Sequence, residues 1–298
     1  MWYQLLIPRP TGPPGLQKAW QIARPTIRVG QFDTNSVRLQ QHPHADTFAE
    51  IHFPRSYVAP PRLPHGFRCL DVDHCADIRV KATIENIQKT SAAYHATSWA
   101  DTVLYRAIVT SLDLAPANID FLTGEYYRDL VENPSSPASV RIDFESPFVT
   151  PPKVVVFFNL LDIVQKGGYH IRTTASEIDT LGFTLTIESW GATILRCAQA
   201  CWIAYPEDRK HIFSTSVNTN VVSGLKQKRS KAINFTNVEF WRMPDVFVAF
   251  NELNFDGTVN LGIEAYVDNV TTIGLTWHLD TLYESTLGSV GATIVVVN

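Results

Sequence analysis

The chain repeats itself at intervals of 91 residues, and this repeat constrains its fold more than any other feature of the sequence. An Ile-x-Phe motif begins at Ile51, Ile142 and Ile233. The other landmarks are Leu70-Asp71 with Leu161-Asp162 and, one residue out of step, Leu253-Asn254, together with Trp99 and Trp190. A unit of this length is too long for a solenoid repeat and suits a small domain. The sequence therefore predicts an N-terminal arm, residues 1–25, and three repeats at residues 26–116, 117–207 and 208–298.

The residue pattern within each repeat is typical of β-structure. Residues 154–158 form a continuous apolar run with β-branched side chains, as in a strand that is buried on both faces. Residues 182–188 alternate between apolar and polar side chains, as in a strand with one face in solvent. Turn-forming clusters such as residues 165–168 separate these segments, and no segment shows a convincing helical period. About six short strands per repeat predict an all-β fold of three tandem six-stranded antiparallel β-sandwich domains.

Composition argues against several classes of partner. The 25 basic and 29 acidic residues give a net charge of −4, so no strongly basic surface is expected for nucleic acid or for electrostatic membrane docking. No apolar run reaches the roughly 18 residues of a membrane helix. The first residues lack both the basic segment and the long apolar segment of a signal peptide. We therefore expect a protein that is cytoplasmic or released without a signal peptide.

The sequence contains none of the usual catalytic or cofactor motifs. A glycine-rich phosphate loop, G-x-S-x-G, H-E-x-x-H and zinc-finger spacings are all missing, so we predict no enzyme and no cofactor. Residues 71–77 gather several possible metal ligands, but the equivalent loops of the other repeats lack them, and a solvated acidic loop is expected. The four cysteines are expected to be free thiols. Cys197 and Cys201 would lie roughly 13 Å apart on one strand face, too far for a disulfide.

The second repeat carries the most specific set of landmarks. In order, these are Ile142-Asp-Phe-Glu-Ser-Pro-Phe-x-x-Pro-Pro, Leu161-Asp162, Gly182-Phe183, Trp190 and Cys201-Trp202-Ile203. This order and spacing resembles the H-type lectin domain of snail agglutinins and discoidins. The first repeat matches through Ile51-His-Phe, Pro60-Pro61, Leu70-Asp71, Ile78-Arg79-Val80, Trp99 and Tyr105, and the more diverged third through Ile233-Asn-Phe, Leu253-Asn254 and Gly274-Leu275. The resemblance covers nearly everything after residue 25.

The resemblance implies a six-stranded sandwich that assembles as a trimer and binds galactose or N-acetylgalactosamine in clefts between protomers. Three tandem copies then imply a covalent pseudo-trimer, because a closed ring of three similar units uses one heterologous interface three times. The implied partners are glycans or glycoconjugates of the galactose type. Further self-association stays open.

The resemblance also implies positions for the sugar-binding residues. The family places an arginine on one side of the cleft, with an acidic residue before the Ile-x-Phe strand. The other side carries a tryptophan, a histidine directly after it, and a tyrosine six residues past the tryptophan. The first repeat keeps Arg79, Trp99 and Tyr105, has Ala100 at the histidine position, and offers Asp46 or His44 as the acidic residue.

The second and third repeats depart further from this pattern. The second keeps Trp190, has Gly191 at the histidine position and Arg196 at the tyrosine position, and places His170, or alternatively Arg172 on the same strand face, at the arginine position. The third has Gly262, Leu282, Tyr283 and Gly288 at the four positions and has lost the family site.

Since the family takes the arginine and the tryptophan from different protomers, Arg79 is expected to face Trp190 or Leu282 of a neighbouring repeat. By the same reasoning, Trp99 and Tyr105 are expected to face either Gly262 or one of the two alternatives His170 and Arg172.

Each of these side chains also has a structural interpretation. Trp99 and Trp190 fit core positions at strand ends, Tyr105 fits a packing position, and Arg79 fits an interface ion pair.

Two function classes follow. The first is a lectin for galactose or N-acetylgalactosamine. The second is an interaction or scaffold protein that keeps the fold without binding sugar. An enzyme is a remote third class, because no pair of acids recurs as glycoside hydrolysis would require.

Overall fold

The computed structural model describes residues 27–133, 135–166, 168–219, 228–238, 240–255, 257–282 and 287–298, with the side chain of Leu287 excepted. The N-terminal arm predicted at residues 1–25 lies outside the described residues. The described chain consists of strands and one short 3-10 helix, η1 (Thr34–Ser36). Among these residues no helix is long and apolar enough to cross a membrane.

Each repeat contributes six strands, as predicted. Repeat 1 has β1 (Arg28–Asp33), β2 (Asp46–His52), β3 (His65–Val72), β4 (Ile78–Glu85), β5 (Ser91–Ser98) and β6 (Leu104–Asp113). Repeat 2 has β7 (Leu122–Asp129), β8 (Ser139–Asp143), β9 (Lys153–Ile163), β10 (Tyr169–Ser176), β11 (Gly182–Ser189) and β12 (Leu195–Tyr205). Repeat 3 has β13 (Ile212–Asn218), β14 (Lys228–Asn234), β15 (Asp245–Phe255), β16 (Leu261–Asp268), β17 (Gly274–Thr281) and β18 (Leu287–Val297). The all-β fold class is confirmed.

Each repeat is a sandwich of two three-stranded layers. The inner layers are β1-β6-β3, β7-β12-β9 and β13-β18-β15, and the outer layers are β2-β5-β4, β8-β11-β10 and β14-β17-β16. The strands of the inner layers are the more completely buried: β9 is buried along nearly its whole length, because one face packs in its own sandwich and the other faces the neighbouring repeats. The outer strand β11 alternates between buried and partly exposed residues, as its sequence predicts.

The layers do not end at the borders of the repeats. Each outer layer pairs with the inner layer of another repeat, so every sheet has six strands, three from each of two repeats. We call these junctions the first seam (β4·β9, repeats 1 and 2), the second seam (β10·β15, repeats 2 and 3) and the third seam (β16·β3, repeats 3 and 1). Three seams close the three repeats into a ring, which confirms the predicted pseudo-trimer.

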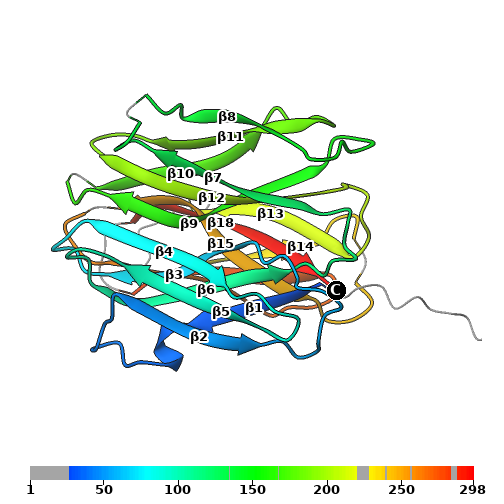
Figure 1. Ribbon diagram of the computed structural model, residues 1–298, viewed down its shortest axis with the longest axis horizontal. Coiled ribbons are helices and arrows are strands. Elements are labelled where there is room, and N and C mark those ends of the chain that lie inside the picture. Colours follow the sequence, from blue (N-terminus) through cyan, green and yellow to red (C-terminus); the bar gives the residue numbers. More distant parts are fainter. Residues whose placement is uncertain are drawn as a thin grey trace, which may run out of the picture.

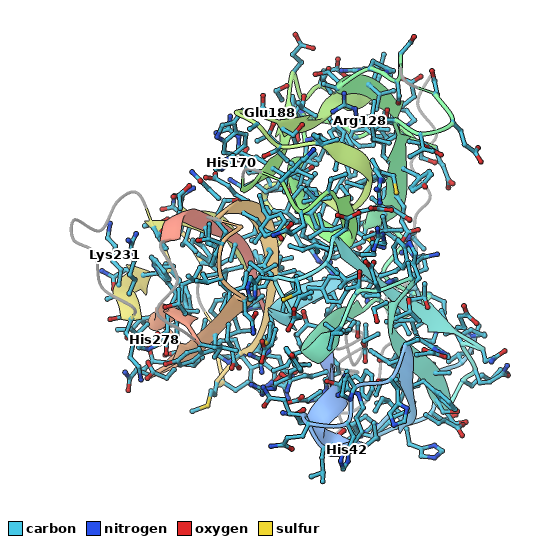
Figure 2. The ribbon with its side chains drawn as sticks, turned by 90° about the vertical axis from the view of Figure 1, so that its left-hand side faces the viewer. His42, Arg128, His170, Glu188, Lys231 and His278 are labelled. Carbon is cyan, nitrogen blue, oxygen red and sulfur yellow. The ribbon has the colours of Figure 1, made fainter. Side chains whose placement is uncertain are left out.

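The ring is visible when the molecule is viewed along its strands. The strands lie along the long axis in Figure 1, with the C-terminus at the right-hand end. Figure 2 looks onto the opposite end and shows repeat 2 in green above, repeat 1 in blue and cyan below, and repeat 3 in yellow to red on the left. The third strands of the inner layers, β3, β9 and β15, contact one another along the centre.

The centre of the ring is filled by unequal side chains at equivalent positions. Gly66 pairs with Thr110, Phe157 with Cys201 and Ala249 with Thr293, so these three residues occupy the same place in their repeats. A Cβ atom on Gly66 would lie 2.8 Å from the Phe157 ring and 3.0 Å from the Ala249 Cβ. Phe157 also packs on Phe247, with ring centroids 4.8 Å apart. One large side chain therefore fills a space to which its two counterparts contribute almost nothing.

A buried polar chain runs through repeat 1. The hydroxyl groups of Tyr94 and Ser111 are 2.7 Å apart, and Ser111 donates to Asp113 Oδ1 at 2.9 Å. All three residues are buried. Burial raises the pKa of Asp113 from 3.8 to about 6, the Asp245 charge adds to the rise, and the hydrogen bond from Ser111 opposes it.

We predict that Phe157→Ala lowers the free energy of unfolding by about 3–5 kcal/mol, because neither Gly66 nor Ala249 can fill the cavity that it leaves. Urea denaturation followed by circular dichroism measures the loss. Val149→Ala, at a side chain that is 99% exposed, is the matched control and should change stability by less than about 0.5 kcal/mol. A loss at position 157 no larger than the control would contradict the central packing described above.

The raised pKa of Asp113 predicts a pH dependence with a definite sign. Because the folded pKa lies above the unfolded one, protonated Asp113 contributes fully to the free energy of unfolding below pH about 4. This contribution is lost as the pH rises through about 6. Asp113→Asn should remove this loss and stabilise the protein at neutral pH by about 2–3 kcal/mol relative to wild type. Denaturation midpoints measured between pH 4 and pH 7 test this, with Asp143→Asn, whose side chain is 84% exposed, as the control. Parallel pH profiles for wild type and Asp113→Asn would refute the prediction.

Candidate functional site

The three seams place equivalent residues opposite one another at the end of the molecule that Figure 2 shows. Arg79 pairs with Asp162 at the first seam, His170 with Asn254 at the second, and Gly262 with Asp71 at the third. The arginine position of one repeat therefore meets the Leu-acid landmark of the next. Sequence reasoning identified both positions but not their pairing.

The arginine and tryptophan positions lie in the same repeat, which corrects the expectation that Arg79 faces the tryptophan position of a neighbour. Val80 pairs with Ser98, so Arg79 and Trp99 stand next to this pair at the end of the β4-β5 hairpin. Arg79 also donates to Asp101, two residues past Trp99. The register of β4 with β5 places the two positions side by side, so they cannot belong to two different clefts.

The first seam holds a cluster of five charges from two repeats. Arg79 forms ion pairs with Asp77 and Asp101, and its Nε lies 3.9 Å from Asp162 Oδ1 across the seam. Arg196 of repeat 2 reaches back to Asp77, with Nη1 2.7 Å from Oδ2, and lies 3.6 Å from Asp162 Oδ1. The hydrogen bond from Arg79 lowers the pKa of Asp101, while burial raises that of Asp162 despite the two arginines. Arg79 and Arg196, predicted as site residues of different repeats, thus share their carboxylate partners.

The second seam combines aromatic rings with charged and uncharged polar groups. The His170 Nδ1 atom lies 2.8 Å from Asn254 Oδ1 across the seam, and the His170 ring stacks on Trp190 with centroids 5.8 Å apart. The Arg172 guanidinium carbon lies 5.8 Å from the centre of the Trp190 ring, and the same guanidinium bonds Glu188. His170, Arg172 and Trp190 therefore come together within one repeat, which corrects the expectation that His170 or Arg172 faces Trp99. Figure 2 shows His170 at the border of repeats 2 and 3.

Gly191 has a positive φ, as the equivalent Ala100 of repeat 1 does. Its φ is +65°, a backbone conformation that favours glycine, and a Cβ atom there would lie 3.1 Å from the His170 ring. The histidine that the family carries at this position would be strained here.

The third seam has no aromatic ring at the tryptophan position. Leu282, whose backbone N–H donates to the Gly262 carbonyl, occupies it, and Tyr283 lies outside the described residues. Tyr105 belongs to this end of the third seam rather than to Trp99, because β6 and β5 lie in different sheets. Its hydroxyl donates to Asp73 Oδ2 at 2.7 Å, and this bond is the main cause that raises the Tyr105 pKa to about 12.

Asp46 stands on the same sheet as Trp99 but at its edge. It opens β2, pairs with Thr97 two residues before Trp99, and its carboxylate lies 3.1 Å from the Nδ1 atom of His95. The partner of Asp46 in the described chain is therefore His95, and Arg79 takes its carboxylates from Asp77, Asp101 and Asp162 instead.

The loop of residues 71–77 serves two seams. Asp73 accepts from the backbone N–H of Cys75, and the His74 Nδ1 atom lies 2.7 Å from Asn260 Oδ1 across the third seam. Asp77 accepts from the Gln165 backbone N–H at 2.8 Å across the first seam. Asp73, His74 and Cys75 bring possible metal-ligand atoms together. Asp73 and His74 already hold the loop in place through the hydrogen bonds described above.

Asp77 and Asp101 are the functional candidates that sequence reasoning missed. Asp77 had been noted only as a member of a solvated acidic loop, and Asp101 carried no signal. Both lie near Trp99, whose side chain is 36% exposed, and the Asp101 side chain is 72% exposed.

Comparison with protein-family models identifies the repeats. The model of the H-type lectin domain matches residues 49–110, 139–205 and 230–297, one match in each repeat. No curated protein and no solved structure matches the chain. The three matches together cover more than half of the sequence and confirm the resemblance drawn from its landmarks. The chain belongs to the H-type lectin domain family, as three tandem copies of that domain, and is a carbohydrate-binding lectin by family.

Proposed function

We propose that this lectin binds terminal galactose or N-acetylgalactosamine at the first and second seams, at the end of the molecule shown in Figure 2. Family membership supports carbohydrate binding in general. The observation that carries the finer proposal is the pair of half-exposed tryptophans. Trp99 and Trp190 are 36% and 37% exposed, and each stands beside polar side chains that two repeats contribute.

This combination suits a sugar with one apolar face. An exposed aromatic ring covers the C–H patch of a galactose-type ring, while charged and planar polar groups hold its hydroxyl groups. At the first seam the hydrogen-bonding groups are the Arg79 guanidinium and the Asp101 carboxylate, which bond each other. Solvent reaches this pair from the exposed Asp101 side chain. At the second seam they are the His170 ring, the Asn254 amide and the Arg172 guanidinium.

Among the described residues, the third seam offers no equivalent site. Leu282 replaces the aromatic ring and Gly262 removes the polar side chain that would face Asp71. Gln40 Nε2 instead donates to Asp71 Oδ2 at 2.6 Å. The proposal therefore gives two sugar sites per chain rather than three.

The expected affinity is weak at each site. Neither seam has the complete set of family residues, so we expect a Kd of roughly millimolar, about −4 kcal/mol. Glycans that present several galactose residues would bind more tightly, because a second site on the same chain is engaged at high effective concentration. Binding of this kind needs no chemical step, which agrees with a family of binding domains.

We predict that Trp99→Ala and Trp190→Ala each remove one of the two sites, with unequal effects because the two rings have different polar neighbours. The double variant should lose retention on a galactose resin altogether. Leu282→Ala is the matched control, since it truncates the equivalent side chain at the third seam, and it should be retained like wild type. NMR titration with methyl N-acetylgalactosaminide then counts the sites and measures each Kd.

Two results would count against the proposal in different ways. Wild-type retention by the double variant would mean that the sugar binds elsewhere. Absence of wild-type binding to the resin and to a glycan array would favour the scaffold function, in which Arg79 acts only as an ion-pair partner between repeats.

A further inference from the structure

The first seam carries a second cluster of reactive side chains, away from the tryptophan end. His65 comes from repeat 1, while Glu125 and Cys201 come from repeat 2. Their ligand atoms, a ring nitrogen, a carboxylate oxygen and the thiol sulfur, all lie within 4.8 Å of one another. Cys201 is five residues past Arg196 on β12, so roughly 17 Å of strand separates this cluster from the proposed sugar site.

The other two seams provide an internal comparison for this cluster. Glu125 pairs with Cys201, Ser216 with Thr293, and Gln31 with Thr110 at equivalent points of the three inner layers. The residue that corresponds to His65 is Val156 at the second seam and Val248 at the third. Thr293 and Thr110 donate to the carbonyl groups of these two valines, both at 2.7 Å. Only the first of these three equivalent sets consists of side chains that bind metals.

The polar atoms around the cluster are buried, and one of them, Asn159 Oδ1, has no hydrogen-bond partner in the described chain. The His65 Nδ1 atom lies 2.9 Å from the Leu63 carbonyl oxygen, and Nε2 lies 3.2 Å from the Ala82 carbonyl oxygen. A neutral imidazole has one N–H and can satisfy only one of these carbonyls. Asn159 Nδ2 donates to Glu125 Oε1 at 2.8 Å, while Asn159 Oδ1 is buried without a hydrogen-bond partner in the described chain.

A metal ion fits a neutral His65 that donates through Nδ1. Histidine ligands of metals usually donate their second ring nitrogen to a carbonyl group, as Nδ1 of His65 would to Leu63, which leaves Nε2 for the ion. Thiolate, imidazole and carboxylate are together the donors that zinc prefers. Asn159 Oδ1 adds an oxygen beside the cluster, in the same amide that contacts Glu125.

We propose that His65, Glu125 and Cys201 bind one divalent ion of the zinc class, which ties repeat 1 to repeat 2. Binding forms a metal–sulfur bond and displaces the Cys201 proton. This proton now points to Glu125 Oε1, 3.1 Å from the sulfur, and the exposed Glu125 delivers it to solvent. No electrons are transferred. One proton is released for each ion bound.

The test uses Co²⁺ as a probe of the reduced, chelator-treated full-length chain. We expect one Co²⁺ per chain, a thiolate-to-cobalt charge-transfer band, and displacement of the band by Zn²⁺. Cys201→Thr, which introduces the residue found at the equivalent positions 110 and 293, should abolish the band and weaken Co²⁺ binding at least about tenfold. Cys197→Ser, four residues earlier on the same strand, is the matched control and should keep both.

Further variants separate binding from folding. Glu125→Gln, at an exposed position, should weaken Co²⁺ binding without loss of the fold, and Zn²⁺ should raise the melting temperature of wild type but not of Cys201→Thr. The proposal is overturned if the wild-type chain shows no stoichiometric Co²⁺ binding. It is equally overturned if the band survives Cys201→Thr, or if Cys75→Ser removes it, since the ion would then occupy the 73–75 loop.

Discussion

Backbone pairing across the three seams is the interaction on which the rest of the structure depends. Each seam pairs only a few residues: residues 78–81 of β4 with β9, 169–172 of β10 with β15, and 261–264 of β16 with β3. These short ladders satisfy backbone groups that would otherwise form an open sheet edge on each layer. They also fix which residues of neighbouring repeats meet. The charged cluster around Arg79 and the aromatic group around His170 lie on or beside these ladders, so their composition follows from the register.

Covalent linkage of the repeats allows the three seams to differ. A ring of three separate, identical chains must place the same residue three times around its axis and three times at its interfaces. This chain places Gly66, Phe157 and Ala249 at the axis, and Arg79, His170 and Gly262 at the seams. Linkage also keeps the repeats at high effective concentration, so a single weak interface does not release its partner. Unequal sugar sites are therefore compatible with a stable ring.

The sequence was sufficient for the fold and insufficient for the sites. The 91-residue register and the alternation in residues 182–188 predicted the repeats and their strands, because both depend on local pattern. We predicted wrongly that Arg79 faces the tryptophan position of a neighbouring repeat. Its place beside Trp99 depends on the register of β4 with β5, which the pattern within one strand does not reveal. Tyr105 and Trp99 are six residues apart in sequence, yet they lie in different sheets. His65, Glu125 and Cys201 meet only through tertiary structure.

The polarity of the first seam is difficult to explain by stability alone. Charged groups that are taken out of water lose hydration, and well-packed apolar or neutral polar residues often serve a fold equally well. The chain itself shows this: where the first seam has His65, Glu125 and Cys201, the second has Val156, Ser216 and Thr293, and the ring closes there with the same strand pairing. The third seam also carries charged groups from two repeats, because Glu264 of repeat 3 pairs with Arg68 and Arg106 of repeat 1. Charge alone therefore does not distinguish the first seam. What does is the set His65, Glu125 and Cys201, whose donor atoms suit a metal ion and whose counterparts at the second seam keep the strand pairing without them.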